Sequence, residues 1–239
     1  MPVLSRVPLN PLRSGAQRLL GNPHIAHAAV LGGLAEQPVE ERVLWRLEAE
    51  RHRASLLVLT QSRPSWVHLA EAAGWPGAEG GDALIRDYTP LLDRVALGRE
   101  FAFRLRANTV SSTRRPEKPS AAQRRQLEAP RPRGVRVPER TAAHQLAWFQ
   151  RRLPSWGVEV VERESGEQLR LSGRERQVFF KGGDDGGRRR VVLQTATAEG
   201  ILRVTDADGL RQALLEGCGP GRAYGCGLLT LAPLPSSEA

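Results

Sequence analysis

Cysteine is scarce in this sequence. Only Cys218 and Cys226 occur among the 239 residues, and both lie in one glycine-rich segment near the C-terminus. No histidine cluster accompanies them, so the spacing of a zinc-binding module is absent, and so few cysteines are usual in a reducing compartment. The sequence also lacks a signal-peptide-like apolar segment and any run of about 18 apolar residues. We therefore expect a soluble cytoplasmic protein that holds no metal and does not enter a membrane.

Motifs of nucleotide binding and covalent catalysis are also missing. No Gly-Lys-Ser/Thr follows the glycines near the C-terminus, which excludes a P-loop, and the third glycine of a dinucleotide-binding fingerprint is absent. No Gly-x-Ser-x-Gly elbow occurs, and neither cysteine has a nearby histidine to activate it. The segment RAYGCG at Arg222–Gly227 matches a loop of acyl-CoA-dependent N-acetyltransferases, but a Leu-rich strand follows where those enzymes need a helix. We therefore expect no cofactor.

Positive charge, in contrast, is in excess. The chain has 35 Lys and Arg residues against 26 Asp and Glu, a net charge of +9, and 40% of its residues are hydrophobic. One large or two small folded domains and a polyanionic partner are therefore expected. Residues 109–138 alone hold eight Lys or Arg and two Glu, which is +6 of the total. We expect a basic linker rich in Pro and Ser at 109–134, which is either a disordered connector or part of an RNA-binding surface.

Hydrophobic periodicity in the first half predicts alternating strands and helices. The expected strands are Leu4–Leu9, Val43–Leu47, Leu56–Gln61 and Phe101–Ala107, and the expected helices are His24–Glu36, with Asn22 as N-cap and Pro23 in the first turn, and Ser65–Ala73, with Ser65 as N-cap. Phe101–Ala107 alternates clearly, with phenylalanines on one face and arginines on the other. The resulting order, βαββαβ, is the ferredoxin-like arrangement and predicts a first domain at residues 1–108.

The second half repeats this pattern with an additional strand pair. The expected strands are Val135–Val137, Val158–Glu162, Gln168–Leu171, Val178–Lys181, Arg190–Thr195, Ile201–Thr205 and the terminal LLTLAP, and the expected helices are Glu139–Leu153 and one that Asp206 caps and that ends at Glu216. Asp184 and Asp185, flanked by glycines, are typical of a hairpin tip. We therefore predict an α+β fold of tandem ferredoxin-like (RRM-like) domains, the second at residues 135–239.

The glycine-rich segment GCGPGRAYGCG precedes the terminal strand. Its glycines are Gly217, Gly219, Gly221, Gly225 and Gly227. Glycine lets the backbone approach a bulky anionic ligand, and Arg222 adds a fixed positive charge, so the segment suits a phosphate backbone. A tight turn would account for the same pattern.

Histidines are the best candidates for acid–base chemistry. His24 and His27 are three residues apart in the first expected helix, so both can face one groove. Imidazole titrates near neutral pH and can transfer protons, whereas no Cys, Asp or Glu nearby completes a metal site. Solvent-facing or capping histidines would have the same spacing. For His68 and His144 we prefer ordinary structural roles.

Several of these segments together resemble the CasE family of CRISPR repeat-processing endoribonucleases, the RNA-cutting subunits of type I-E Cascade. The resemblance covers NPHIAH, LLVLTQS, FAFRLRANT, VRVPERTAAHQLAWFQRRL, VLQTATAEGILRVTD and, most specifically, GCGPGRAYGCGLLTLAPL. It implies tandem ferredoxin-like domains that bind the hairpin of a CRISPR repeat transcript and cut at its base without a metal. In that family a ribose 2′-hydroxyl attacks the neighbouring phosphate, which leaves a 2′,3′-cyclic phosphate and a 5′-hydroxyl.

The resemblance also implies roles for particular residues. The family carries Tyr-x-x-His at the early helix, where this chain has His27 as the histidine and His24 in place of the tyrosine. His27 is then the principal catalytic group, and His24 either takes the role of the tyrosine or lines the site. The expected RNA-binding residues are Arg222, Lys181, Arg188, Arg189 and Arg190, with Arg104 and Arg106 as further candidates. The alternatives are a non-catalytic RNA-hairpin-binding subunit of the same fold and an acyltransferase.

Overall fold

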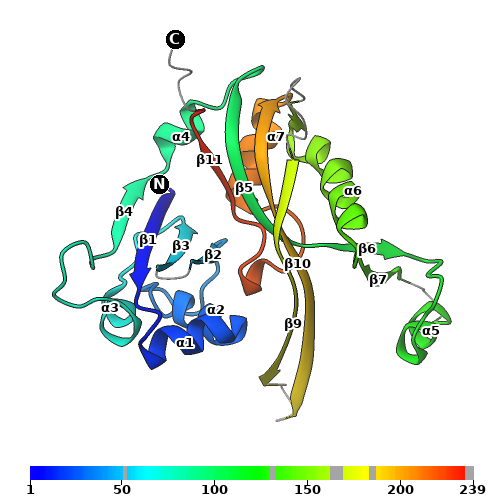
Figure 1. The fold of residues 1–239 in the computed structure, drawn as a ribbon, viewed down its shortest axis with the longest axis horizontal. Coiled ribbons are helices and arrows are strands. Elements are labelled where there is room, and N and C mark those ends of the chain that lie inside the picture. Colours follow the sequence, from blue (N-terminus) through cyan, green and yellow to red (C-terminus); the bar gives the residue numbers. More distant parts are fainter. Residues whose placement is uncertain (51–52, 130–132, 162–168, 183–186, 235–239) are drawn as a thin grey trace.

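The computed structural model describes residues 1–50, 53–129, 133–161, 169–182 and 187–234 (Figure 1). Its first unit consists of β1 (Val3–Leu9), α1 (Ser14–Gly21), α2 (Pro23–Leu31), β2 (Leu44–Ala49), β3 (Ala54–Thr60), α3 (Val67–Ala73) and β4 (Leu84–Asp87). The four strands form one antiparallel sheet in the order β2-β3-β1-β4. This is the strand order of a ferredoxin-like unit.

The second unit repeats this topology. After the short helix α4 (Thr89–Asp93) come β5 (Glu100–Asn108), α6 (Ala142–Arg152), η1 (Leu153–Trp156), β8 (Val158–Val160), β9 (Leu169–Gly182), β10 (Arg188–Val204), α7 (Ala207–Glu216), η2 (Arg222–Tyr224) and β11 (Leu229–Ala232). The strands follow the order β11-β5-β10-β8, and β9 forms a long hairpin with β10. The predicted tandem of ferredoxin-like units is therefore confirmed, with the β9–β10 hairpin as the addition.

The assignment of one strand to the first unit is wrong. We expected Phe101–Ala107 to complete the first sheet, but β5 pairs with β10 and β11 and is a central strand of the second sheet. The first sheet is completed instead by β4, which pairs with β1. A boundary after residue 108 would separate β5 from both of its partners. Alternation of side chains identifies a strand with one buried face, but it carries no information on which strand lies beside it.

The segment between β5 and α6 is also more ordered than the expected linker. Its residues form β6 (Val110–Thr113), α5 (Ala121–Leu127) and β7 (Val135–Pro138). β6 and β7 pair as a separate two-stranded sheet, so the strand expected at Val135–Val137 does not open the second unit. Figure 1 shows this segment, here called the basic arm (residues 109–129 and 133–138), projecting from the body at α5.

Helix boundaries depend on capping residues. The Asn22 side chain accepts a hydrogen bond from the backbone N–H of His24, so the predicted N-cap of α2 is confirmed, although α2 ends at Leu31 and not at Glu36. Asp206 likewise caps α7. The predicted cap Ser65 is wrong, because α3 begins at Val67 and the backbone N–H of Ser65 donates to a loop carbonyl of the first unit.

Other boundaries were predicted in part. The helix expected at Glu139–Leu153 is α6, which Thr141 caps through the backbone N–H of His144. The strands expected at Gln168–Leu171 and Val178–Lys181 are one continuous strand, β9, and those at Arg190–Thr195 and Ile201–Thr205 are one strand, β10. Asp184 and Asp185 lie outside the described residues. Helix α1 was not predicted.

The two units share a hydrophobic core. Helices α1, α2 and α3 cover one face of the first sheet, where Val7 and Val58 are buried. Leu44 and Leu59 of the same sheet are buried in a second cluster that also contains Leu105 of β5. The sheet face that a lone ferredoxin-like unit would leave open is therefore partly covered by the second unit. This packing holds β2 against the glycine-rich end of the chain.

Candidate functional site

Helix α2 presents both candidate histidines at the junction of the two units. Pro23 occupies its first turn and Asn22 caps it, so the helix begins directly before His24. His24 and His27 are half-buried and lie on one side of the helix because residues three apart are neighbours on a helical surface. The N-terminal end of α2 is thus fixed locally, and with it the positions of both imidazoles.

The environment of His27 favours a neutral imidazole. Its Nδ1 atom is buried and has no hydrogen-bond partner within the described residues. Burial lowers the pKa of His27 below its ordinary value, because the protonated ring loses hydration, and the nearby His24 lowers this pKa further. A neutral imidazole is the form that can accept a proton. The surroundings of His27 therefore favour the form of its ring that can accept a proton.

The glycine-rich loop requires its glycines for its own packing. All five, Gly217, Gly219, Gly221, Gly225 and Gly227, have positive φ angles. A Cβ atom on Gly225 would lie 2.8 Å from the Trp45 ring, and one on Gly217 would lie 2.6 Å from Leu44. Both contacts are to β2 of the first unit. The glycines therefore let the end of the chain pack closely against the first sheet, which is the tight-turn interpretation of the pattern.

The loop lies beside helix α2. Within it, Arg222–Tyr224 form the short helix η2, which contacts α2 and β2. The Tyr224 ring packs edge-on against Phe179 of β9, with centroids 4.9 Å apart, and Arg222 donates from Nε to the Gly219 carbonyl at 3.2 Å. The sequence places this loop and the helix that carries the histidines at opposite ends of the chain, whereas the fold brings the loop and α2 into contact.

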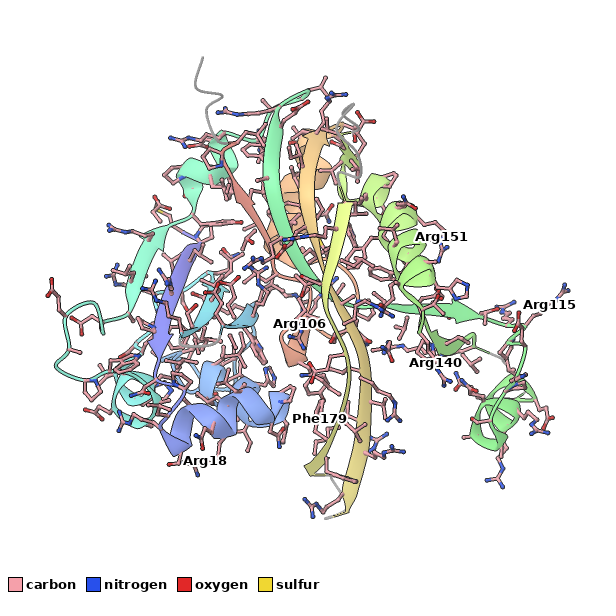
Figure 2. The ribbon with its side chains drawn as sticks, in the orientation of Figure 1. Arg18, Arg106, Arg115, Arg140, Arg151 and Phe179 are labelled. Carbon is pink, nitrogen blue, oxygen red and sulfur yellow. The ribbon has the colours of Figure 1, made fainter. Side chains whose placement is uncertain are left out.

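A small cavity opens next to this contact. It has a volume of about 240 Å³ and is lined by residues of α1, α2, β2, β5, β9 and the glycine loop: Leu20, Pro23, Trp45, Leu47, Ala49, Arg106, Glu175, Gln177, Tyr224 and Gly225. Oε1 of Gln177 and Nε1 of Trp45 are buried without a hydrogen-bond partner in the described part of the chain. Polar groups are therefore available on the walls of this junction. Figure 2 labels Arg106 and Phe179 on the side of β9 that faces α2.

The β9–β10 hairpin brings positive charge to the same region. β9 contacts α2. At the end of β9 nearest the hairpin turn, Lys181 lies opposite Arg189 of β10, and Phe180 lies opposite Arg190. Arg188, Arg189 and Arg190 are exposed, and the Arg188 guanidinium lies over the Phe180 ring at 5.3 Å. No acidic partner of these four cations occurs among the described residues. The hairpin end is thus a basic surface close to α2.

Arg104 and Arg106 have a different environment from the hairpin cations. Arg104 forms ion pairs with Glu199 at 2.6 Å and Glu48 at 3.3 Å, and Arg106 pairs with Glu175 at 3.1 Å. Both guanidinium groups are thus held by carboxylates of the fold, although Glu48 also pairs with Arg46 and Glu199 with Arg170. These contacts favour a role in joining strands over phosphate binding.

Sequence reasoning missed Arg46, which completes this network. It is 3% exposed, pairs with Glu48 at 2.7 Å and donates to the carbonyls of Arg104 and Leu228. Burial lowers its pKa, and Glu48 acts in the opposite direction. The sequence signal that could have identified it is the single arginine among apolar residues in the strand LWRLEA, since a buried arginine is almost always paired.

The other histidines considered in the sequence, and both cysteines, lie in surroundings that do not favour catalysis. Nε2 of His68 lies 2.9 Å from the carbonyl of Ala29, and His144 is exposed near the start of α6. Both cysteines are buried, and burial raises the pKa of Cys218 to about 12 and that of Cys226 to about 11, so neither thiol is activated. The described residues contain no group of three or more potential metal ligands, and none of their helices is long and apolar enough to cross a membrane.

Comparison with known proteins gives a consistent result over the whole chain. The family model described as CRISPR associated protein matches residues 3–233. The CRISPR-associated endoribonuclease Cse3 of Thermus thermophilus is 32% identical over 239 residues, which cover 96% of this chain and 99% of that protein. The CRISPR system Cascade subunit CasE of Escherichia coli is 34% identical over 142 residues, or 59% of this chain and 62% of that protein.

A solved structure supports the same comparison. Thermus thermophilus Cse3, bound to an RNA that represents a pre-cleavage complex, is similar with a TM-score of 0.70 and 29% identity. The similarity covers 97% of this chain and 99% of that one. The common fold therefore includes both units and the junction between them.

Proposed function

This chain belongs to the family of CRISPR-associated proteins, and from that membership we propose that it is an endoribonuclease that binds the hairpin of a CRISPR repeat transcript and cuts at its base. The similar proteins include an endoribonuclease and a structure bound to RNA. The observation that carries the proposal is the half-buried His27, whose lowered pKa favours the neutral imidazole and whose helix, α2, contacts the glycine-rich loop.

The reaction we propose is a transesterification, in which the nucleophile is a hydroxyl group of the RNA itself. Neutral His27 takes the proton of a ribose 2′-hydroxyl, and the resulting oxygen attacks the adjacent phosphorus. The bond from phosphorus to the 5′-oxygen then breaks. The products are a 2′,3′-cyclic phosphate and a 5′-hydroxyl, so atoms and charges balance without water, a metal or a cofactor as a reactant.

The leaving oxygen and the phosphorane need further groups. His24, one turn before His27 on the same face of α2, protonates the leaving 5′-oxygen. Arg222 of the neighbouring loop stabilises the additional negative charge on the phosphorane, because fixed cations act strongly where water is partly excluded.

Substrate binding rests on the hairpin of the protein. The cations Lys181, Arg188, Arg189 and Arg190 contact the phosphates of the RNA stem beside α2. Side chains cannot read the deep, narrow groove of an RNA duplex, so shape and phosphate contacts dominate. We further propose that the complex of protein and product RNA joins the other subunits of Cascade, because the Escherichia coli relative is named as a Cascade subunit. We also propose that the product RNA stays bound and that the complex acts in the cytoplasm.

A cleavage assay in EDTA tests the proposal. Repeat-hairpin RNA is incubated with the protein, with and without a 2′-deoxy substitution at the cut. We expect cleavage in EDTA with a 2′,3′-cyclic phosphate end, and no cleavage of the deoxy substrate. A requirement for divalent metal, or cleavage of the deoxy RNA, would overturn this mechanism.

One observation favours a second candidate function. His24 replaces the tyrosine of the family pattern, which is the change expected if catalysis had been lost and hairpin binding kept. A non-catalytic RNA-binding subunit would bind the hairpin tightly and with strong salt dependence, yet give no product in the same assay. Restoration of cleavage by His24→Tyr would then attribute the loss to this position.

A further inference from the structure

We propose that the basic arm is a second RNA-binding surface, which contacts the phosphate backbone of the transcript outside the repeat hairpin. The inference rests on the proposed function, since it assigns an additional contact to the same RNA. The arm comprises β6, α5 and β7 and lies on the side of the β9–β10 hairpin away from α2 (Figure 1). It is therefore separate from the surface around His27.

The root of the arm is buried and rigidly connected to β10. The backbone N–H of Thr109 donates to the Gln194 carbonyl at 2.8 Å, and the Gln145 side chain donates to the Thr109 hydroxyl at 3.1 Å. Nε1 of Trp148 donates to the Val110 carbonyl at 2.9 Å. Thr109 and Gln145 are fully buried, so these hydrogen bonds are shielded from water. The arm is thus held in a defined direction relative to the hairpin.

Polar contacts hold α5 in the outer part of the arm, beside the one buried apolar side chain of β7, Val135. Ser120 and Gln123 form a capping box at the start of α5, and α5 buries none of its residues. The side chains of Gln123 and Gln126 donate to carbonyls of the segment that contains β7, at 3.0 and 3.3 Å. A helix held without apolar burial presents most of its surface to solvent. The fold therefore displays this segment and buries little of it.

The displayed surface is cationic, and its charges are unmatched. Exposed basic side chains on the arm are Arg114, Arg115, Lys118, Arg124, Arg125, Arg133 and Arg136. None of them forms an ion pair within the described part of the chain. Like charges gathered on one segment repel each other and destabilise it unless a polyanion neutralises them. The arrangement is therefore explained by a polyanionic partner.

A cavity of about 570 Å³ at the base of the arm is also lined by basic side chains. Arg115, Lys118, Arg140 and His144 contribute to its walls, together with Glu117 and Glu139. The Glu139 carboxylate accepts a hydrogen bond from the Ser111 hydroxyl and pairs with Arg151 at 3.5 Å, so its charge is already balanced. Figure 2 shows Arg115, Arg140 and Arg151 along this outer side, away from the first unit. The basic surface is therefore continuous from the arm to α6.

The chemistry of the surface favours RNA over a protein partner. Protein interfaces rely on aromatic and other apolar anchors, yet no exposed large hydrophobic side chain among the described residues belongs to the arm. Residues 109–147 also contain no Phe, Trp or Tyr on which a base could stack. The contact is thus electrostatic, made to phosphates and independent of sequence. The flanking transcript is the polyanion already held nearby.

The test compares two RNAs. One is the repeat hairpin alone, and the other carries single-stranded extensions long enough to cross the arm; both have a 2′-deoxy substitution at the cut. The variant is R115Q/R124Q/R125Q, and the matched control is R63Q/R86Q/R94Q, which removes two exposed arginines of the first unit and the exposed arginine that directly follows α4. Circular dichroism and the urea midpoint establish that each variant is folded.

The arm variant should bind the hairpin alone like the unchanged protein but bind the extended RNA more weakly. Each lost phosphate contact flattens the salt slope by about 0.7, so the slope for the extended RNA should flatten by about 2. Raising salt from about 50 to about 200 mM should then weaken binding by the unchanged protein about 16-fold more than binding by the variant. The control variant should match the unchanged protein with both RNAs.

The remaining outcomes overturn the inference in distinguishable ways. An equal loss with both RNAs would place the arm in the hairpin site. No loss with either RNA would remove RNA as the partner and leave an acidic protein surface to explain the charge. Cleavage of unmodified hairpin RNA by the arm variant reports on the proposed function separately, because that activity should persist even if the arm binds nothing.

Discussion

Arg46 on β2 donates a hydrogen bond of 2.9 Å to the main-chain oxygen of Leu228, just before β11. A single buried side chain of the first unit thereby satisfies a backbone acceptor of the second. The same guanidinium donates to the carbonyl of Arg104 on β5 at 3.0 Å. The junction that holds α2 beside the glycine-rich loop thus depends on a charged group shared by the two sheets.

Replacement of Arg46 should weaken the whole protein. Arg46→Met removes the side-chain donor of the buried Leu228 carbonyl, one of two side-chain donors to the Arg104 carbonyl, and the closest cation of Glu48. We therefore expect a loss of about 2–4 kcal/mol in the free energy of unfolding. Arg42→Met is the matched control, because Arg42 forms an exposed ion pair with Glu216 between the same two units. The control should cost less than about 1 kcal/mol. Urea unfolding measures both, and equal losses would contradict a special role of burial.

His27→Ala should remove the general base and leave the RNA-binding surface intact. We expect the single-turnover cleavage rate to fall by about 10²–10⁴-fold, while the dissociation constant for hairpin RNA is unchanged. His68→Ala serves as the control, because His68 lies on α3 and its Nε2 is 2.9 Å from the carbonyl of Ala29 on α2, the helix that carries His27. Its rate should stay near that of the unchanged protein. Loss of hairpin binding in His27→Ala would identify His27 as structural.

The pH dependence of cleavage should reflect the lowered pKa of His27. Burial, and then His24, keep the folded imidazole neutral at pH values where an ordinary imidazole, of pKa 6.5, is half protonated. The acid side of the pH profile of kcat/KM should therefore have its midpoint below 6.5. His24→Gln removes the neighbouring charge, so the midpoint should move up towards 6.5 but remain below it. A midpoint at or above 6.5 in the unchanged protein would contradict a buried base.

The same shift links His27 to stability. Between pH 6.5 and the lower pKa of the folded state, the unfolded chain binds a proton at this position that the folded protein does not. The free energy of unfolding should therefore fall as pH drops through this range. His27→Ala should reduce this slope, which urea titrations at several pH values can measure.

Gly225 should be more sensitive to substitution than a glycine with the same backbone angle in open space. Gly225 and Gly77 have φ of 75° and 73°, but only the Cβ at Gly225 would meet the Trp45 ring, at 2.8 Å. Gly77→Ala should cost about 1–2 kcal/mol from the left-handed backbone alone. Gly225→Ala should cost about 1–3 kcal/mol more, because β2 must shift to admit the methyl group. Equal costs would show that the loop packs loosely on β2.

Local sequence patterns were sufficient for several elements. Asn22 followed by Pro23 predicted the start of α2, and Asp206 the start of α7, because capping depends only on a side chain and the backbone two or three residues later. Alternation in FAFRLRA predicted a strand for the same local reason. The class of fold and the choice of His27 followed from such patterns and from the resemblance of several segments to one family.

The tertiary structure decided which strands pair and which residues each side chain contacts. β5 joins β10 and β11 of the second unit, although its own alternation would suit either sheet. Arg104 looked like a free cation on a strand face but is neutralised by two carboxylates, of which Glu199 lies 95 residues further on. The sequence showed that residues 109–138 are basic, but it did not show the hydrogen bonds at Thr109 that fix the direction of the arm relative to β10. Helix caps and strand alternation are short-range effects, whereas pairing, burial and charge neutralisation are settled by residues that folding alone brings into contact.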